Sequence, residues 1–127
     1  PITDILGNVR TKNNIKMDGM AVWSFINSKV PDQIKGLLER NQLTIKDIDQ
    51  IVFHQASLMT LDSLVKILNL EKDKVFINIH NLGNTVSASI PIALKDAMNK
   101  GRIKENERIL LSGFGVGLAY GTIIINT

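Results

Sequence analysis

Two side chains in this sequence could together polarise a carbonyl group. His54 follows an apolar run at residues 51–53, and Asn84 lies 30 residues later in the turn sequence GNT. A neutral imidazole and a carboxamide can both donate hydrogen bonds to one carbonyl oxygen. Donors that are fixed before a reaction stabilise the oxyanion that forms during it, and losing one typically costs about 10²–10³ in rate. This pair contains no nucleophile, so it would supply only half of an active site.

A glycine-rich turn, GFGVG at residues 113–117, is the third feature that could do chemistry, because it could add a backbone N–H donor. It lacks the lysine of a P-loop and precedes a predicted strand rather than a helix, which argues against nucleotide binding. Taken singly, each feature has an ordinary structural explanation. A histidine at a strand end is usually a satisfied polar group, and Gly-Asn is common turn chemistry. A functional interpretation therefore depends on all three together.

Composition excludes several other classes of chemistry. The chain has 127 residues, of which 44% are hydrophobic and 21% charged, as expected for one globular domain. Without cysteine there is no disulfide, thiolate metal site or cysteine nucleophile in this chain, and with only two histidines we expect no metal site. The scattered net charge of +3 argues against a nucleic-acid partner. The absence of a long apolar run or leader predicts a soluble, cytoplasmic protein without a membrane partner.

The hydrophobic pattern predicts an α/β fold with a mixed, largely parallel sheet, helices on its faces and a C-terminal antiparallel hairpin. Pro31 is expected to divide the first helical region in two. The predicted helices cover residues 17–30, 31–42, 58–68 and 86–101, with a short helical turn near 44–49, and the predicted strands cover 51–53, 74–79, 108–113 and 118–126. Residues 1–16 are expected to form an N-terminal arm or inter-domain segment, and residues 17–127 the domain.

The predicted elements bring the three features together. In open α/β sheets, ligands bind beyond the carboxyl ends of the strands. His54, Asn84 and the turn at residues 114–117 all follow predicted strands. We therefore expect all three at one edge of the sheet.

The motifs also carry a family resemblance. HQAS at residues 54–57, LGNTVSASIPIAL at 82–94 and LLSGFGVGLAYGTIII at 110–125 occur in the order and at the spacing of one family. From about Met17 to its end, the chain resembles the C-terminal half of the 3-oxoacyl-(acyl-carrier-protein) synthase III family, the β-ketoacyl synthase III enzymes of the thiolase superfamily. The resemblance implies a partner, the N-terminal half, that carries a catalytic cysteine. A chain that begins with Pro1 and lacks cysteine is expected to be a piece of a longer protein, inactive alone.

The resemblance implies specific roles in a decarboxylative condensation of an acyl-CoA with a malonyl-carrier protein. His54 and Asn84 would be the catalytic partners of the cysteine and would stabilise the malonyl-derived enolate. Val116 would offer its backbone N–H to the acyl-cysteine, and Phe114 would lie beside that cysteine. Lys66 matches a basic position for contact with carrier protein or coenzyme A. The implied substrates are coenzyme A and phosphopantetheine thioesters, with no further cofactor; the implied partners are acyl carrier protein and a second copy in a homodimer.

Several positions depart from the family pattern. Ser57 replaces the usual asparagine, Met59 replaces a docking arginine, and Met20 and Ser24 stand where basic or polar contacts are common. These departures leave the catalytic pair intact and alter the expected docking surface. Three hypotheses therefore remain open: a condensing enzyme of fatty-acid biosynthesis, a synthase III-like acyltransferase of secondary metabolism, and an isolated domain that acts only as an inactive packing or interaction module.

Overall fold

A three-stranded sheet lies at the centre of the computed structural model, which describes residues 1–127. Strand β3 (Gln50–Phe53) pairs in parallel with β4 (Arg108–Gly115), and β4 pairs antiparallel with β5 (Ala119–Asn126). One further parallel bridge joins Ile51 to Val75. The predicted mixed α/β sheet with a C-terminal hairpin is therefore confirmed.

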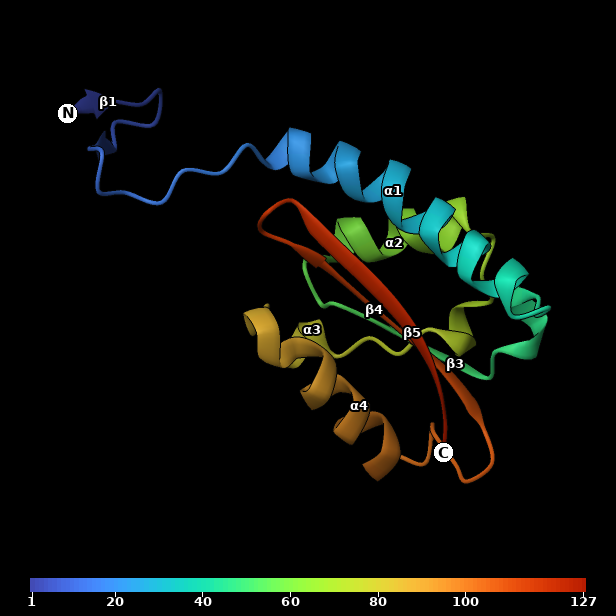
Figure 1. Ribbon diagram of the computed structural model, residues 1–127. Coiled ribbons are helices and arrows are strands. Elements are labelled where there is room, and N and C mark those ends of the chain that lie inside the picture. The colour runs from blue at the N-terminus through green and yellow to red at the C-terminus, as the bar shows by residue number, and fades with distance from the viewer.

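Helices cover both faces of this sheet (Figure 1). Helices α1 (Gly19–Arg40) and α2 (Leu58–Ile67) pack on one face, where a cluster of 13 buried apolar residues forms the larger core. Helix α4 (Ser89–Asn99) packs on the other face over a cluster of six. Strand β3 is buried along its whole length, because it is covered from both sides. No helix combines the length and apolarity needed to span a bilayer.

Local sequence signals set several element ends. Ser57 caps α2 by accepting a hydrogen bond from the Thr60 amide at 3.2 Å. Thr44 and Asp47 form the capping box of the short 3₁₀ helix η1 (Ile45–Asp47). Pro91 is the third residue of α4, where its missing N–H costs least.

The predicted break at Pro31 is wrong. Helix α1 runs without interruption through 22 residues, with Pro31 buried inside it. The residues Ile26, Val30 and Ile34 lie on both sides of the proline and are all buried in the larger core. Packing of this continuous apolar stripe outweighs the one backbone hydrogen bond that proline removes.

The strand predicted at residues 74–79 is also shorter than expected. Only Val75 bridges β3, between the 3₁₀ helix η2 (Lys72–Lys74) and the short helix α3 (Ile79–Leu82), which replaces part of a predicted loop. The Gln55 side chain takes the place of a neighbouring strand: its Nε2 donates to the Phe76 carbonyl at 3.4 Å and its Oε1 accepts from the Asn78 amide at 3.1 Å. This segment is therefore held by one backbone bridge, in which the Phe76 amide donates to the Ile51 carbonyl at 3.0 Å, and by the buried Gln55 carboxamide.

The first residues form a small hairpin that stands apart from the sheet (Figure 1). Strands β1 (Ile2–Thr3) and β2 (Val9–Arg10) pair antiparallel, and the Asp4 carboxylate holds the turn by accepting from the Asn8 amide and the Arg10 guanidinium. The hydrogen bonds from Asn8 and Arg10 lower the pKa of Asp4. The apolar side chains of this hairpin are exposed, so local polar contacts hold it together.

Candidate active site

His54 lies at the carboxyl end of β3, where backbone pairing fixes its position. Its amide donates to the Ser112 carbonyl at 2.8 Å, which extends the parallel ladder by one residue. The imidazole Nδ1 lies 2.5 Å from the Ser89 hydroxyl, and the ring meets Phe114 edge-on with 5.5 Å between centroids. The ring is half-buried, and this burial lowers the pKa of His54 from its ordinary 6.5. The imidazole is therefore mainly neutral near pH 7.

Asn84 lies in the turn between α3 and the 3₁₀ helix η3 (Val86–Ala88). Its Oδ1 accepts from the Val86 amide at 2.9 Å, and its Nδ2 donates to the carbonyl of Ala56 at 3.3 Å. Ala56 is two residues beyond His54, so this contact ties the Asn84 turn to the histidine segment. A carboxamide nitrogen carries two hydrogens, and the second remains available for a ligand.

The glycine-rich turn joins β4 to β5 beside these residues. Val116 is 99% exposed at its tip. Gly117 has a φ of +141°, and a Cβ there would lie 2.9 Å from the Ala119 backbone nitrogen. Glycine is therefore required at this position, both for the backbone conformation and for the close approach.

One large open cavity brings most of the predicted residues together. Its volume is about 1620 Å³, and its lining includes His54, Asn84, Phe114 and Val116. Lys66 lies on the exposed side of α2 and does not line it. The structure thus gathers four of the five candidate residues and leaves Lys66 outside. No group of three or more potential ligand side chains is placed to hold a metal ion.

Of the four positions that depart from the family pattern, Ser24 is exposed on α1 outside the large cavity, and the other three fall in two groups. Ser57 caps α2, a role for which serine and asparagine are equally suited, so this exchange preserves the helix start. Met20 and Met59 both line the large cavity and are 70% and 62% exposed. The cavity wall is therefore apolar at two positions where the resemblance implies charge or polarity.

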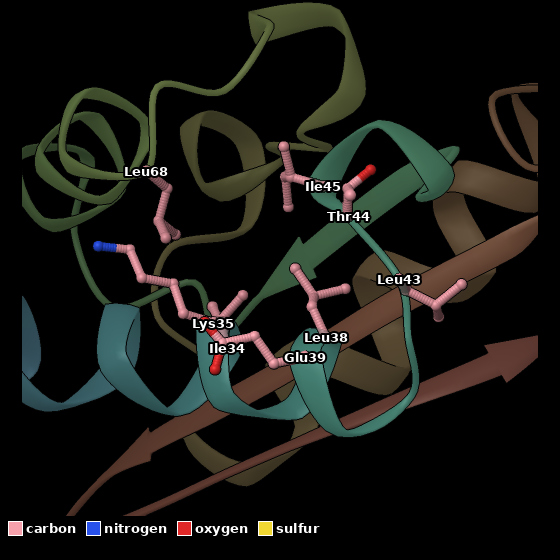
Figure 2. Close-up of a pocket in the computed structure, with 8 residues that line it drawn as sticks. All are labelled: Ile34, Lys35, Leu38, Glu39, Leu43, Thr44, Ile45 and Leu68. Carbon is pink, nitrogen blue, oxygen red and sulfur yellow. The ribbon is translucent and has the colours of Figure 1, made fainter.

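A second hollow lies at the other end of α1 and contains no reactive pair (Figure 2). Its volume is about 260 Å³. It is lined by Ile34, Lys35, Leu38, Glu39, Leu43, Thr44, Ile45 and Leu68. Five of the eight are apolar, and none is a histidine or carboxamide. Of these two cavities, only the large one contains both a histidine and a carboxamide side chain.

Ser89 is the site residue that the sequence analysis missed. The sequence analysis placed it only inside the predicted helix 86–101, but its hydroxyl is in contact with the imidazole of His54, 35 positions earlier. The available signal was a serine in the first turn of the helix that follows the GNT motif. Only the packing of α4 against the end of β3 reveals the contact.

The fold and the site together define a thiolase-like α/β unit in which His54, at the carboxyl end of β3, and Asn84, in the turn after α3, line one cavity. The family described as 3-oxoacyl-[acyl-carrier-protein (ACP)] synthase III C terminal matches residues 38–127. The chain belongs to this family.

Individual relatives agree with this assignment. The chain is 39% identical over 119 residues to a β-ketoacyl-[acyl-carrier-protein] synthase III of Clostridium perfringens, covering 94% of this chain and 37% of the relative. It is 42% identical over 125 residues to the enzyme of the same name from Nostoc sp., covering 95% and 38%. A crystal structure of a 3-oxoacyl-(acyl-carrier-protein) synthase III superimposes with a TM-score of 0.94 at 33% identity, covering 99% of this chain and 37% of that one. The chain thus spans little more than a third of these relatives.

Proposed function

We propose that this chain is the C-terminal catalytic half of an enzyme that condenses an acyl-CoA with a malonyl-carrier protein in fatty-acid biosynthesis. The observation that carries the proposal is that His54 and Asn84 line one cavity and are tied together through Ala56. Family membership and the β-ketoacyl synthase III relatives support the same reaction.

In the proposed reaction, an N-terminal half supplies a cysteine thiolate. The thiolate attacks the acyl-CoA thioester, and coenzyme A leaves as the acyl-cysteine bond forms. The malonyl thioester then loses carbon dioxide, and the bonding electrons pass into an enolate. His54 Nε2–H and the free Asn84 N–H donate to the enolate oxygen. The α-carbon attacks the acyl-cysteine carbonyl, and the thiolate leaves as the 3-oxoacyl product forms.

The lowered pKa of His54 suits the proposed role. A donor to an enolate oxygen should be a neutral imidazole with a proton on Nε2, and burial favours the neutral form. Val116, exposed at the tip of the turn, would offer its backbone N–H to the acyl-cysteine oxygen. Phe114, which packs against the imidazole, would also border the cysteine.

The proposed partners are the N-terminal half, acyl carrier protein and a second subunit. The coverage of about 37% of the relatives' length supports the first of these, and the relatives' names support the second. Lys66, outside the cavity but exposed on α2, would contact the carrier protein or coenzyme A. No metal or other cofactor is proposed. A cytoplasmic homodimer stays a prediction, and light scattering of the intact protein would test its stoichiometry.

The proposal is tested by malonyl-thioester decarboxylation in the intact protein. His54→Ala and Asn84→Ala should each lower the rate by about 10²–10³, because each removes one donor to the enolate oxygen. His80→Ala and Asn81→Ala are matched controls, since both residues are exposed and outside the cavity. Decarboxylation that survives both site substitutions at the rate of the controls would contradict the roles assigned to the pair.

A second candidate is a synthase III-like acyltransferase of secondary metabolism. The methionines at positions 20 and 59 favour it, because they make the cavity wall apolar where a phosphopantetheine acceptor would meet charge. Analysis of products formed with malonyl and non-malonyl acceptors would separate the two candidates. A protein that forms no product with either acceptor would favour the third hypothesis, an inactive packing module.

A further inference from the structure

Ser89 makes a buried contact that the proposed reaction does not yet use. It is the first residue of α4 and is 2% exposed. Its Oγ lies 2.5 Å from Nδ1 of His54, and it also accepts a hydrogen bond from the Gln55 amide at 3.3 Å. The start of α4 is therefore fastened to the two residues that follow β3.

The hydrogen-bonding capacity of the Ser89 hydroxyl decides which group donates in its hydrogen bond with His54. A serine hydroxyl has one proton to donate and two lone pairs to accept with. The Gln55 amide can only donate, so it occupies one lone pair. The remaining partner of the hydroxyl is His54 Nδ1, and Ser89 is too buried to use solvent. The Ser89 proton is therefore satisfied only if the hydroxyl donates to Nδ1.

The opposite assignment leaves a polar group unsatisfied. If Nδ1 carried the proton, the Ser89 oxygen would accept two hydrogen bonds and its own proton would be buried without an acceptor. Buried donors without partners are unfavourable. A neutral imidazole whose Nδ1 accepts must carry its proton on Nε2.

We propose that Ser89 is a positioning residue that holds His54 in the tautomer with its proton on Nε2. The functional meaning of this inference rests on the proposed function, in which Nε2–H donates to the enolate oxygen. The segment that begins with Asn84 thus sets both donors: it carries the carboxamide and, five residues later, the hydroxyl that fixes the imidazole. The edge-on contact with Phe114 fixes the plane of the same ring.

The tautomer can be read directly by ¹⁵N NMR of the intact protein with labelled histidine, and a His54→Gln variant assigns the signals. At a pH where His54 is neutral, Nδ1 should give the signal of an unprotonated nitrogen and Nε2 that of a protonated one. Ser89→Ala should move both signals toward the average of the two tautomers, whereas Ser89→Thr, which keeps the hydroxyl, should restore them. Ser87→Ala, an exposed serine in the same segment, is the matched control and should change neither signal.

Two outcomes would overturn the inference. One is a wild-type spectrum that shows the proton on Nδ1. This measurement does not depend on whether any variant folds. The other is a folded Ser89→Ala variant with the wild-type pattern. Activity supplies a second readout: Ser89→Ala should lower kcat for decarboxylation with little change in KM. If the Nε2-protonated tautomer is confirmed but decarboxylation does not depend on His54, the proposed function is contradicted and the inference about Ser89 still holds.

Discussion

The two faces of the sheet are held by different interactions. On the α1–α2 face, 13 buried apolar residues form the larger core. The α4 face has six, supplemented by partly buried polar contacts, among them Ser89 with His54 and Asn78 with Asp96. The α1–α2 face stabilises the fold mainly by apolar burial and contributes Phe114, which packs edge-on against the imidazole of His54. On the α4 face, Ser89 hydrogen-bonds to Nδ1 of the same ring. Core substitutions on the α1–α2 face away from Phe114 should therefore mainly lower stability, whereas substitution of Ser89 should mainly alter the geometry of His54.

The largest effect on stability is expected on the apolar face. Leu64 is fully buried in the larger core. Leu64→Ala should lower the free energy of unfolding by about 2–5 kcal/mol, because it removes apolar contacts and leaves a cavity. Denaturant unfolding monitored by circular dichroism would measure it.

Leu58→Ala is the matched control for this substitution. Leu58 lies on the same helix but is 40% exposed, so its truncation should cost much less. Equal losses for the two leucines would show that the α1–α2 face does not dominate stability.

Features of the fold that depend on neighbouring residues were predictable from the sequence, and features that depend on long-range packing were not. The Ser57 cap, the Thr44 capping box and the place of Pro91 were predictable, because each depends on neighbours in the chain. The break at Pro31 was predicted wrongly, because packing on both sides of the proline decided the outcome. The short pairing at Val75 could not be foreseen, because a distant side chain replaces the ladder.

The candidate site shows the same limit. Motif spacing indicated that His54 and Asn84 belong together, and the structure places both in one cavity. Lys66, which matches a basic position for contact with carrier protein or coenzyme A, lies on the exposed side of α2 outside that cavity, and its role stays a prediction. Ser89 was missed as a site residue, because a contact across 35 positions depends on how α4 packs on the sheet.

An intermediate effect is expected from Gln55, whose buried side chain contacts three backbone groups. It donates to the carbonyls of Phe53 and Phe76 and accepts from the Asn78 amide. Gln55→Ala should lower the free energy of unfolding by about 1–3 kcal/mol, because it leaves buried polar groups unpaired. The Asn78 amide should also lose protection in hydrogen exchange.

Gln50→Ala provides the comparison. Gln50 is the same residue type in the preceding strand, but its side chain makes one hydrogen bond, to the Asp73 carbonyl. Gln50→Ala should lower the free energy of unfolding by less than Gln55→Ala and should leave the Asn78 amide protected from hydrogen exchange. If the Asn78 amide exchanges equally slowly in both variants, the hydrogen bond from this amide to the Gln55 side chain does not hold the segment in place.

The smallest effect is expected from pH. Burial lowers the pKa of His54 below 6.5, so under acidic conditions the unfolded chain binds this proton more readily than the folded one. The contribution of His54 to stability is therefore fully present above the unfolded pKa and is lost as the pH falls from there toward the folded pKa. Unfolding curves at about pH 7 and about pH 5 should diverge more in the wild type than in His54→Gln. An equal pH dependence would contradict the lowered pKa.

A double-mutant cycle on His54 and Asn84 tests the central claim most directly, with malonyl-thioester decarboxylation by the intact protein as the readout. If both side chains donate to one enolate oxygen, His54→Ala and Asn84→Ala should each cost about 10²–10³ in rate. The double variant should lose less than the product of the two factors, because the donors act as a unit. Losses that multiply exactly would show that the two residues act independently, and no loss in either single variant would contradict the account of this site.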